Sequence, residues 1–270
     1  MSSARKRYTD ELAKRFGGYY AAWTPGDHLQ LGDIGMLEGK SFKRIGNIAD
    51  LGLTFERRAD PTPETLGPYK SSGKVTVDFK AAGAAQLPNS HLAQADAGFS
   101  IRFAGEHAVV FIAEGCFQPS IADQLQLGRD IIALFKEGRW NSSWHVITQL
   151  VEAASMTVLI SSSSNGGVDL KVTADIDAAI GAEDLAKAEL GLKLQASREM
   201  ETTLLAQKGA TPMFRLSRMR KPIFGKPNFK MAAVKPSPAL LPELPLEAIT
   251  PGTLKAFPQL EEYLTFGEAD

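Results

Sequence analysis

Cysteine is almost absent from this sequence. The chain of 270 residues contains only Cys116, which excludes an internal disulfide framework and a zinc site built from cysteines. A chain that uses neither fits a reducing compartment such as the cytoplasm. Cys116 follows a glycine at the end of a predicted strand, and no base stands beside it in the sequence. We therefore expect a buried small side chain and not a nucleophile.

Histidine is scarce as well, and the familiar catalytic motifs are missing. His28, His91, His107 and His145 are far apart, and none has the spacing of a metal-binding pair such as HxxxH. The chain has no GxSxG, no GxGxxG after a strand and no paired-carboxylate motif. We expect a protein that is not an enzyme and that uses no metal and no cofactor. An enzyme whose site assembles from distant residues stays open as an alternative.

The sequence also lacks a long apolar run. No window reaches the roughly 18 apolar residues of a membrane-spanning helix. The basic N-terminal residues MSSARKRYTDELAKRF have no apolar segment behind them, as a secretory signal would. We therefore expect a cytoplasmic protein. Strands are not excluded from a membrane by this argument, because a membrane-spanning strand needs only about 9–11 residues.

Size and composition are those of a globular protein. The length allows one large domain or two small ones, and 44% hydrophobic with 23% charged residues excludes a disordered chain. The formal net charge of -1 indicates no class of partner, so the distribution of the charges matters more than their total.

Two helices are predicted. The first covers Tyr8 to Phe16, with Thr9 as its N-cap and two glycines behind it. The residues around it are mostly basic, which fits either a solvated terminal helix or a helix that contacts acidic lipid headgroups. The second covers residues 119–138, with Ser120 and Asp123 spaced as in a capping box and Gly138 at its end.

Four stretches alternate between apolar and polar residues, as half-buried strands do. They lie at 74–80, 98–104, 168–174 and 190–195, and a turn at Gly105-Glu106 makes 98–113 a candidate hairpin. Between Met156–Ile160 and Val168–Ala174 stands SSSSNGG, which we interpret as the tip of a second hairpin. It lacks the lysine and the spacing of a phosphate-binding loop. The apolar residues of the four alternating stretches are Val75, Val77, Phe79, Phe99, Ile101, Phe103, Val168, Leu170, Val172, Leu190, Leu192 and Leu194.

Charge separates by sign near the C-terminus. From Phe214 to Lys235 there are seven basic residues and no acid, whereas from Leu241 to Asp270 six acids stand against Lys255, a net charge of -5. A proline-rich segment, KPSPALLPELP, lies between them and is not expected to hold regular structure. The basic run lacks the repeated aromatic residues of an RNA-binding sheet, so we expect no nucleic-acid partner.

The C-terminal residues are therefore predicted to form a separate acidic segment that docks on the body. We divide the chain into a body (1–221), a linker (222–245) and a tail (246–270). The apolar residues of the tail expected to anchor it are Leu254, Phe257, Leu260, Tyr263, Leu264 and Phe266. The fold class predicted from these elements is α+β, with a twisted, mostly antiparallel central sheet, surrounding helices, two latent β-hairpin regions (74–113 and 153–206) and the docked tail.

The order of these elements resembles that of the bacterial gasdermins. A short N-terminal helix is followed by GGYYAAWTPGDHLQLGDIGML, a first amphipathic hairpin region, a helix, a second hairpin region and a short tail. The similarity is best at Trp144–Val172, a strand, a polar tip and a strand, and next best at Thr211–Arg218. It covers about residues 8–220 as an arrangement of elements.

The resemblance implies a function. Gasdermins of this kind are inactive monomers in the cytoplasm, held by a short C-terminal segment. A partner protease cuts the linker, and the body oligomerises on the inner membrane into a transmembrane β-barrel pore that kills the cell, often as defence against phage. The alternating residues named above would then form the membrane-inserting strands. The lysines expected near the cleavage site are Lys226, Lys230 and Lys235.

Acidic lipids are expected to contact the basic residues near the N-terminus and those near the end of the body. On this reading the lipid contacts are Arg5, Lys6, Arg7, Lys14, Arg15, Arg215, Arg218, Arg220 and Lys221. One departure from the family stands at the N-terminus, where members often carry a lipidated cysteine within the first few residues and this chain reads MSSARKR. The alternative hypothesis is a non-enzymatic α+β binding module whose tail docks on a partner.

Overall fold

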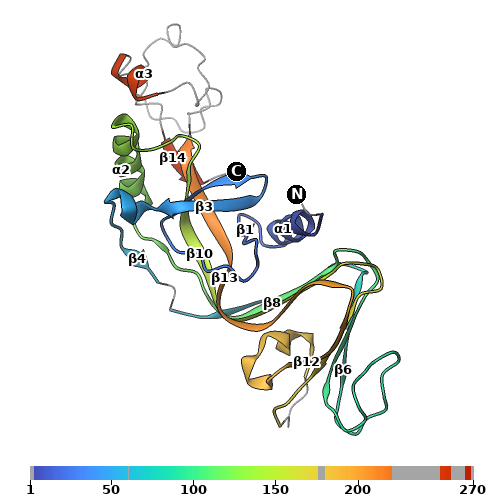
Figure 1. Cartoon of the computed structure of the whole chain (residues 1–270). Coiled ribbons are helices and arrows are strands. Elements are labelled where there is room, and N and C mark those ends of the chain that lie inside the picture. Colours follow the sequence, from blue (N-terminus) through green and yellow to red (C-terminus); the bar gives the residue numbers. More distant parts are fainter. Residues whose placement is uncertain (1–2, 60, 176–179, 221–249, 257–264, 269–270) are drawn as a thin grey trace, which may run out of the picture.

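The fold is α+β, with a curled and mostly antiparallel sheet (Figure 1). The structure is a computed structural model that describes residues 3–59, 61–175, 180–220, 250–256 and 265–268. Within them the helices are α1 (Ser3–Arg15), α2 (Gln124–Lys136) and α3 (Pro251–Ala256), and the 3₁₀ turns are η1 (Ile48–Leu51), η2 (Ala182–Ala186) and η3 (Ala188–Leu190). None of these helices is long and apolar enough to cross a membrane.

The strands of the described residues form two sheets. The large sheet has ten strands: β1 (Tyr20–Ala21), β2 (Asp33–Glu38), β3 (Ser41–Asn47), β4 (Arg57–Arg58), β5 (Glu64–Lys70), β8 (Val109–Phe117), β9 (Ser120–Ile121), β10 (His145–Ser161), β13 (Met200–Arg220) and β14 (Thr265–Glu268). The small sheet has four, in the order β12 (Lys193–Arg198), β11 (Gly167–Lys171), β7 (Gly98–Phe103) and β6 (Val75–Lys80).

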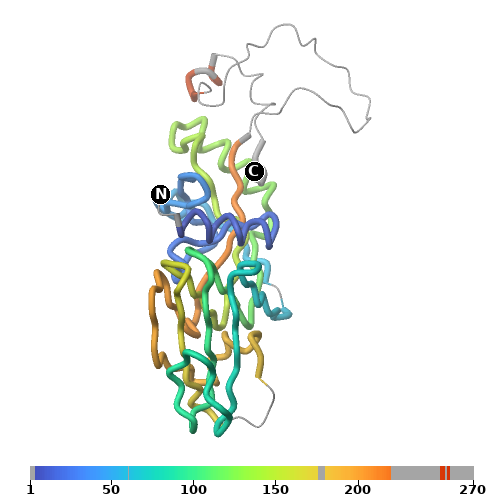
Figure 2. Tube along the Cα trace, turned by 90° about the vertical axis from the view of Figure 1, so that its right-hand side faces the viewer, coloured from blue at the N-terminus to red at the C-terminus, as the bar shows by residue number. Residues whose placement is uncertain are grey.

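The molecule is elongated along its two longest strands. β10 and β13 run from the end that carries α2 toward the end that carries the small sheet, and Figure 2 shows the same long axis from the side. Three apolar clusters follow this axis. We name them the α2 cluster, the α1 cluster and the inter-sheet cluster, after the element or the interface that each one fills.

The α1 cluster explains the first helix. Ala4, Tyr8 and Leu12 are four residues apart, lie on one face of α1 and are fully buried against β8, β10 and β13. The helix therefore begins earlier than predicted, because this spacing continues upstream of Tyr8. Thr9 is not an N-cap as predicted: it is buried in the helix, where its hydroxyl donates to the carbonyl oxygens of Arg5 and Lys6.

The second helix begins later than predicted. Asp123 is its N-cap and accepts a hydrogen bond from the backbone N–H of Gln126. Ser120, predicted to cap the helix, belongs instead to strand β9 and pairs with Gln149 of β10. Ser120 and Ile121 form a strand and not a helical turn because their backbone groups find partners in both neighbouring strands, β4 and β10.

Both predicted hairpins are wrong as pairings. β7 and β8 do not pair with each other: β7 lies in the small sheet between β6 and β11, and β8 lies in the large sheet between β5 and β10. SSSSNGG likewise joins β10 of the large sheet to β11 of the small sheet and is not a hairpin tip. Each of these turns carries the chain from one sheet to the other, so local turn chemistry predicted a bend but not its partners.

The alternating leucines after residue 189 do not form one strand. Leu190 ends the 3₁₀ turn η3, and Gly191 adopts a left-handed conformation (φ 58°) that interrupts an extended chain. Leu192 precedes β12, and only Leu194 lies in that strand, where it is 49% exposed. Val172 lies just past the end of β11 but is buried.

The apolar face of α1 should carry much of the stability of the fold. We expect Leu12→Ala to lower the free energy of unfolding by about 2–5 kcal/mol, because Leu12 is fully buried and the substitution leaves a cavity. Leu125→Ala on α2 is the matched control, since Leu125 is 77% exposed, and should change stability by less than about 0.5 kcal/mol. Urea unfolding checks both, and equal losses would contradict this packing.

Candidate functional site

The small sheet and the adjoining part of the large sheet are built from the same four lengths of chain. β5 leads into β6, β7 into β8, β10 into β11 and β12 into β13. The order β13, β10, β8, β5 in the large sheet is matched by β12, β11, β7, β6 in the small one. The two sheets are therefore covalently joined, strand by strand, at one level of the molecule, which we call the corner.

The pairing register between the two central lengths is the same in both sheets. In the small sheet Arg102 pairs with Gly167, and in the large sheet Val109 pairs with Ile160. Six residues separate these pairs on each side, 103–108 and 161–166. Two backbone hydrogen bonds continue this register into the corner. On the side of the small sheet the N–H of Phe103 donates to Gly166 O, and on the side of the large sheet the N–H of Ser161 donates to Ala108 O.

The corner is made of small and polar residues. The four segments that pass through it are 71–74, 104–108, 162–166 and Glu199. Ser161 organises it, because its hydroxyl donates to Gly105 O and accepts from the N–H of Ala108. His107 lies at the same level between Glu106 and Glu201, at 3.3 Å from each carboxylate.

Between the two sheets lies the inter-sheet cluster. Phe99, Ile101 and Phe103 point into it from β7, and Val168 and Leu170 from β11, all of them buried. The half-buried residues Val75, Val77 and Phe79 of β6 pack against it from the edge. The predicted alternation of these three strands is thus confirmed, with the apolar side facing the large sheet.

The other side of the small sheet is polar and is partly covered by residues 81–97. Lys80 is only 2% exposed, and its ammonium group donates to the carbonyl oxygens of Ala93, Gln94 and Asp96 at 2.8–3.0 Å. Three acceptors satisfy the three protons of a lysine, which makes its burial tolerable. Nothing in the sequence indicates this role, since Lys80 stands at a polar position of an alternating strand.

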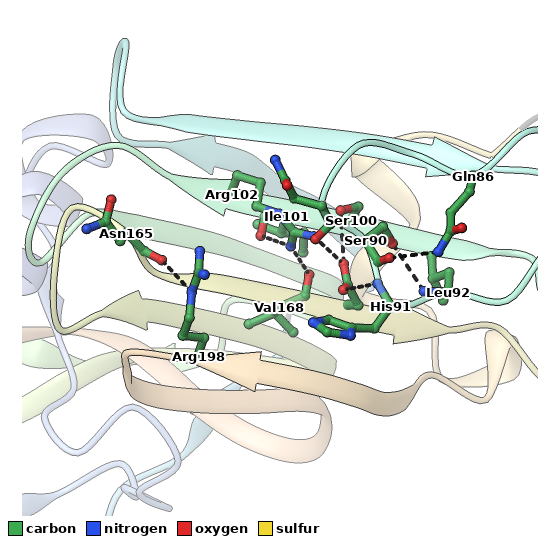
Figure 3. A network of polar contacts seen from close by, with 12 residues as sticks. Gln86, Ser90, His91, Leu92, Ser100, Ile101, Arg102, Asn165, Val168 and Arg198 are labelled. Atoms are coloured by element: carbon green, nitrogen blue, oxygen red, sulfur yellow. Dashed lines mark hydrogen bonds and ion pairs between the residues drawn. The ribbon is translucent and has the colours of Figure 1, made fainter.

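Asp169 is the second anchor of this segment. It is 2% exposed and accepts from the N–H of His91, the hydroxyl of Ser100 and the guanidinium of Arg102, at 2.7–2.9 Å. Figure 3 labels these three partners. Burial by itself would raise the pKa of Asp169, but these hydrogen bonds and the charge of Arg102 outweigh it and hold that pKa below its usual value. Arg102 also donates to Asn89 O, which ties the covering segment to the sheet.

A small polar pocket opens beside this network. It has a volume of about 60 Å³ and is lined by His91, Arg102, Asp169 and Arg198 among others. Arg198 donates to the carbonyl oxygen of Asn165 at the corner (Figure 3). Arginines from two different strands of the small sheet therefore lie on the same face.

The basic residues predicted to contact lipid fall into two groups. Lys6, Lys14 and Arg15 of α1 are exposed, whereas Arg5 and Arg7 are half-buried, Arg7 in an ion pair with Glu11 at 2.7 Å. Of the second group, Arg215 stacks over Tyr19 just behind α1. Arg218 and Arg220 stand opposite β14 at the far end of β13. Lys221 lies outside the described residues.

The described parts of the tail contact the body at two points. α3 buries Leu254, 5% exposed, in the α2 cluster. β14 pairs antiparallel with the end of β13, with Phe266 opposite Met219. The other predicted anchors, Phe257, Leu260, Tyr263 and Leu264, lie outside the described residues, as do the linker 222–245 and its lysines Lys226, Lys230 and Lys235.

Among the described residues no group of three or more His, Cys, Asp and Glu is arranged to hold a metal. Cys116 is buried as predicted, and burial raises the pKa of its thiol to about 12. His145 is also buried, which together with the charge of Arg218 lowers its pKa.

Comparison with known proteins does not assign this arrangement to a family. No protein-family model matches the chain, and no curated protein matches it. The geometry of the two joined sheets is therefore the main guide to function.

The Asp169 network should give the fold a distinctive pH dependence. A carboxyl group whose pKa is lowered by folding stabilises the fold above its unfolded pKa of about 3.8, and this contribution is lost as the pH falls through the folded pKa. We expect Asp169→Asn to lower the free energy of unfolding by about 2 kcal/mol near pH 7. The difference from the wild type should shrink below about pH 4.

Urea unfolding at a series of pH values measures this difference. Asp78→Asn, at an exposed position on the same face, is the control and should leave stability nearly unchanged. A loss at Asp169→Asn that stays constant from neutral to acidic pH would mean that shape, and not charge, is what the site requires.

Proposed function

We propose that this chain is an autoinhibited pore-forming protein. Proteolytic removal of the tail lets the body oligomerise into a transmembrane β-barrel pore that kills the cell in defence against phage, as the resemblance to the bacterial gasdermins implies. One observation supports this most: the register of β7–β8 with β10–β11 is the same in both sheets.

Because the register is shared, the two sheets can unfold into one continuous sheet while every residue keeps its present partner on the neighbouring strand. If the corner straightened, residues 98–117 would form one strand paired with 152–171, and the pairs already present would be kept. Each of these lengths has 20 residues, whereas a membrane-spanning strand needs about 9–11. The outer two lengths, 64–80 and 193–220, would extend the same antiparallel sheet to four strands.

The straightened strands would have one apolar face. Successive side chains of a strand alternate, so Phe99, Ile101, Phe103, Val109 and Phe111 would share a side. Their partners on that side include Leu170, Val168, Ile160 and Val158. To the opposite side the small sheet supplies Ser100 and Arg102, and the large sheet supplies Val110 and Ile112. The small-sheet half therefore has the apolar side and the polar side that a lipid-facing strand of a pore requires.

In the folded chain this apolar side is hidden in two places. Its lower half, Phe99 to Phe103, lies in the inter-sheet cluster, and its upper half, Val109 and Phe111, lies under α1 in the α1 cluster. The ring of Phe16, just past α1, contacts that of Phe111 with centroids 5.8 Å apart. Activation on this proposal therefore requires both the opening of the corner and the departure of α1 from the sheet.

The tail has a position suited to inhibition. β14 covers the edge of β13 at residues 217–220, and β1 covers the same edge at Met213 and Phe214. A strand edge without a partner invites pairing with another chain. Release of the acidic tail would thus free an edge for a second copy, while the tethered tail holds it through high effective concentration.

Cleavage of the linker should release membrane-disrupting activity. The test uses the full chain with a site-specific protease sequence placed at Lys235, mixed with vesicles of acidic phospholipid that contain a trapped dye. We expect dye release only after the protease is added, and none from a chain with a scrambled site. If cleavage frees the tail without membrane binding or leakage, the alternative of a binding module is favoured.

A disulfide across β13 and β14 should separate cutting from release. Arg220 and Thr265 stand directly opposite each other, and such pairs have Cα atoms about 4.5–5.5 Å apart, within the range of a disulfide. We expect the oxidised variant Arg220→Cys/Thr265→Cys to stay inactive after the linker is cut and to leak dye when a reductant is added. Each single cysteine variant serves as the control, because Cys116 is buried.

Leakage from the oxidised, fully cut double variant at the rate of the single variants would contradict the inhibitory role of β14. Gel electrophoresis without reductant verifies that the disulfide has formed in that sample.

A further inference from the structure

The polar face of the small sheet carries its charges in cross-strand rows. The pairing registers place four residues, one from each strand, in each row. The first row is Thr76, Arg102, Gly167 and Arg198; the second is Asp78, Ser100, Asp169 and Ala196; the third is Lys80, Gly98, Lys171 and Lys193.

The rows alternate in sign and are positive in sum. The first carries two arginines, the second two aspartates and the third three lysines, a net charge of three positive charges. Asp96, which lies just beyond the third row and forms an ion pair with Lys171, lowers this to two. The chain as a whole has a net charge of -1, so the excess of positive charge is a property of this face.

The positive charges of this face are kept out of the apolar interior. Lys80 is held by three carbonyl oxygens, Lys171 by Asp96, and Arg102 by Asp169. Lys193 and Arg198 are exposed on the edge strand β12. The opposite face holds the inter-sheet cluster. If this sheet enters a membrane, charge therefore dictates that the three rows face water and the cluster side faces lipid.

We propose that the rows line the pore and make it selective for anions, an inference that rests on the pore-forming function proposed above. Repetition of the sheet around an oligomer turns each row into a ring of charge. Rings of lysine and arginine attract anions and repel cations, whereas rings of acids do the reverse. The acidic ring lies between two basic rings, one on each side, and the three rings together leave an excess of positive charge along the wall.

Salt concentration should control the strength of this selectivity. Mobile ions screen the wall over the Debye length, about 30 Å at 0.01 M salt and about 3 Å at 1 M. The preference is thus expressed at low salt even in a pore much wider than an ion, and it disappears at high salt.

The measurement is the reversal potential across a planar lipid bilayer under a gradient of potassium chloride. The full chain with the cleavable linker is activated by protease in the chamber. At roughly 0.01 M salt we expect a chloride-to-potassium permeability ratio of about two or more, which falls toward one near 1 M.

Charge reversal on β12 tests the wall directly. Lys193→Glu/Arg198→Glu changes the sum of the three rows from three positive to one negative charge, and both side chains are exposed, so the fold is expected to survive. The reversal potential should move through zero to the cation-selective side. The matched control is Lys43→Glu/Arg139→Glu, which also replaces one exposed lysine and one exposed arginine. Arg139 matches Arg198 because each donates a hydrogen bond to a backbone carbonyl oxygen. The control should leave the reversal potential unchanged.

The outcomes separate the two proposals. Absence of conductance from every cleaved protein would overturn the pore-forming function itself. Conductance without anion preference at low salt, or a preference that Lys193→Glu/Arg198→Glu does not alter, would overturn only the assignment of the rows to the pore wall. Circular dichroism of both double variants verifies that each is folded before the bilayer measurement.

Discussion

The structure depends on one set of backbone hydrogen bonds, the pairing of β7–β8 with β10–β11. These two lengths of chain pass through the corner together and keep the same register in the large and the small sheet. The outer lengths, β5–β6 and β12–β13, pair on either side of them. Both the division into two sheets and the apolar cluster between them follow from the bend of this central pair.

The bend makes each central strand serve two apolar clusters. A strand that passes straight through six residues would present alternate residues to one side, but the corner shifts the alternation. Phe103 therefore lies in the inter-sheet cluster, as does Val110, while Val109 and Phe111 lie in the α1 cluster. In the bent form α1 covers the large sheet, and the apolar side of the small sheet packs on the large sheet and on Leu185, Ala186 and Leu190 of the 3₁₀ turns η2 and η3.

The charged side chains of the small sheet are held by residues distant in the sequence. The covering segment 81–97 supplies carbonyl oxygens to Lys80 and Arg102 and a carboxylate to Lys171. At the opposite end of the molecule, β14 supplies backbone partners to the last residues of β13. In both places the hydrogen-bond partners come from a segment that is distant in the sequence. They satisfy the charged side chains in the first case and the strand backbone in the second, as buried polar groups require.

The sequence by itself determined three of the strands and the side of each that is apolar: Val75, Val77, Phe79, Phe99, Ile101, Phe103, Val168 and Leu170 face one cluster, as their alternation predicts. It also located α2 and the burial of Cys116. The partners of each strand, the Lys80 carbonyl cage and the N-terminal extension of α1 were decided only by the tertiary structure. The physical reason is that alternation is a local property of a strand, whereas pairing, and the satisfaction of a buried charge, depend on residues tens of positions away.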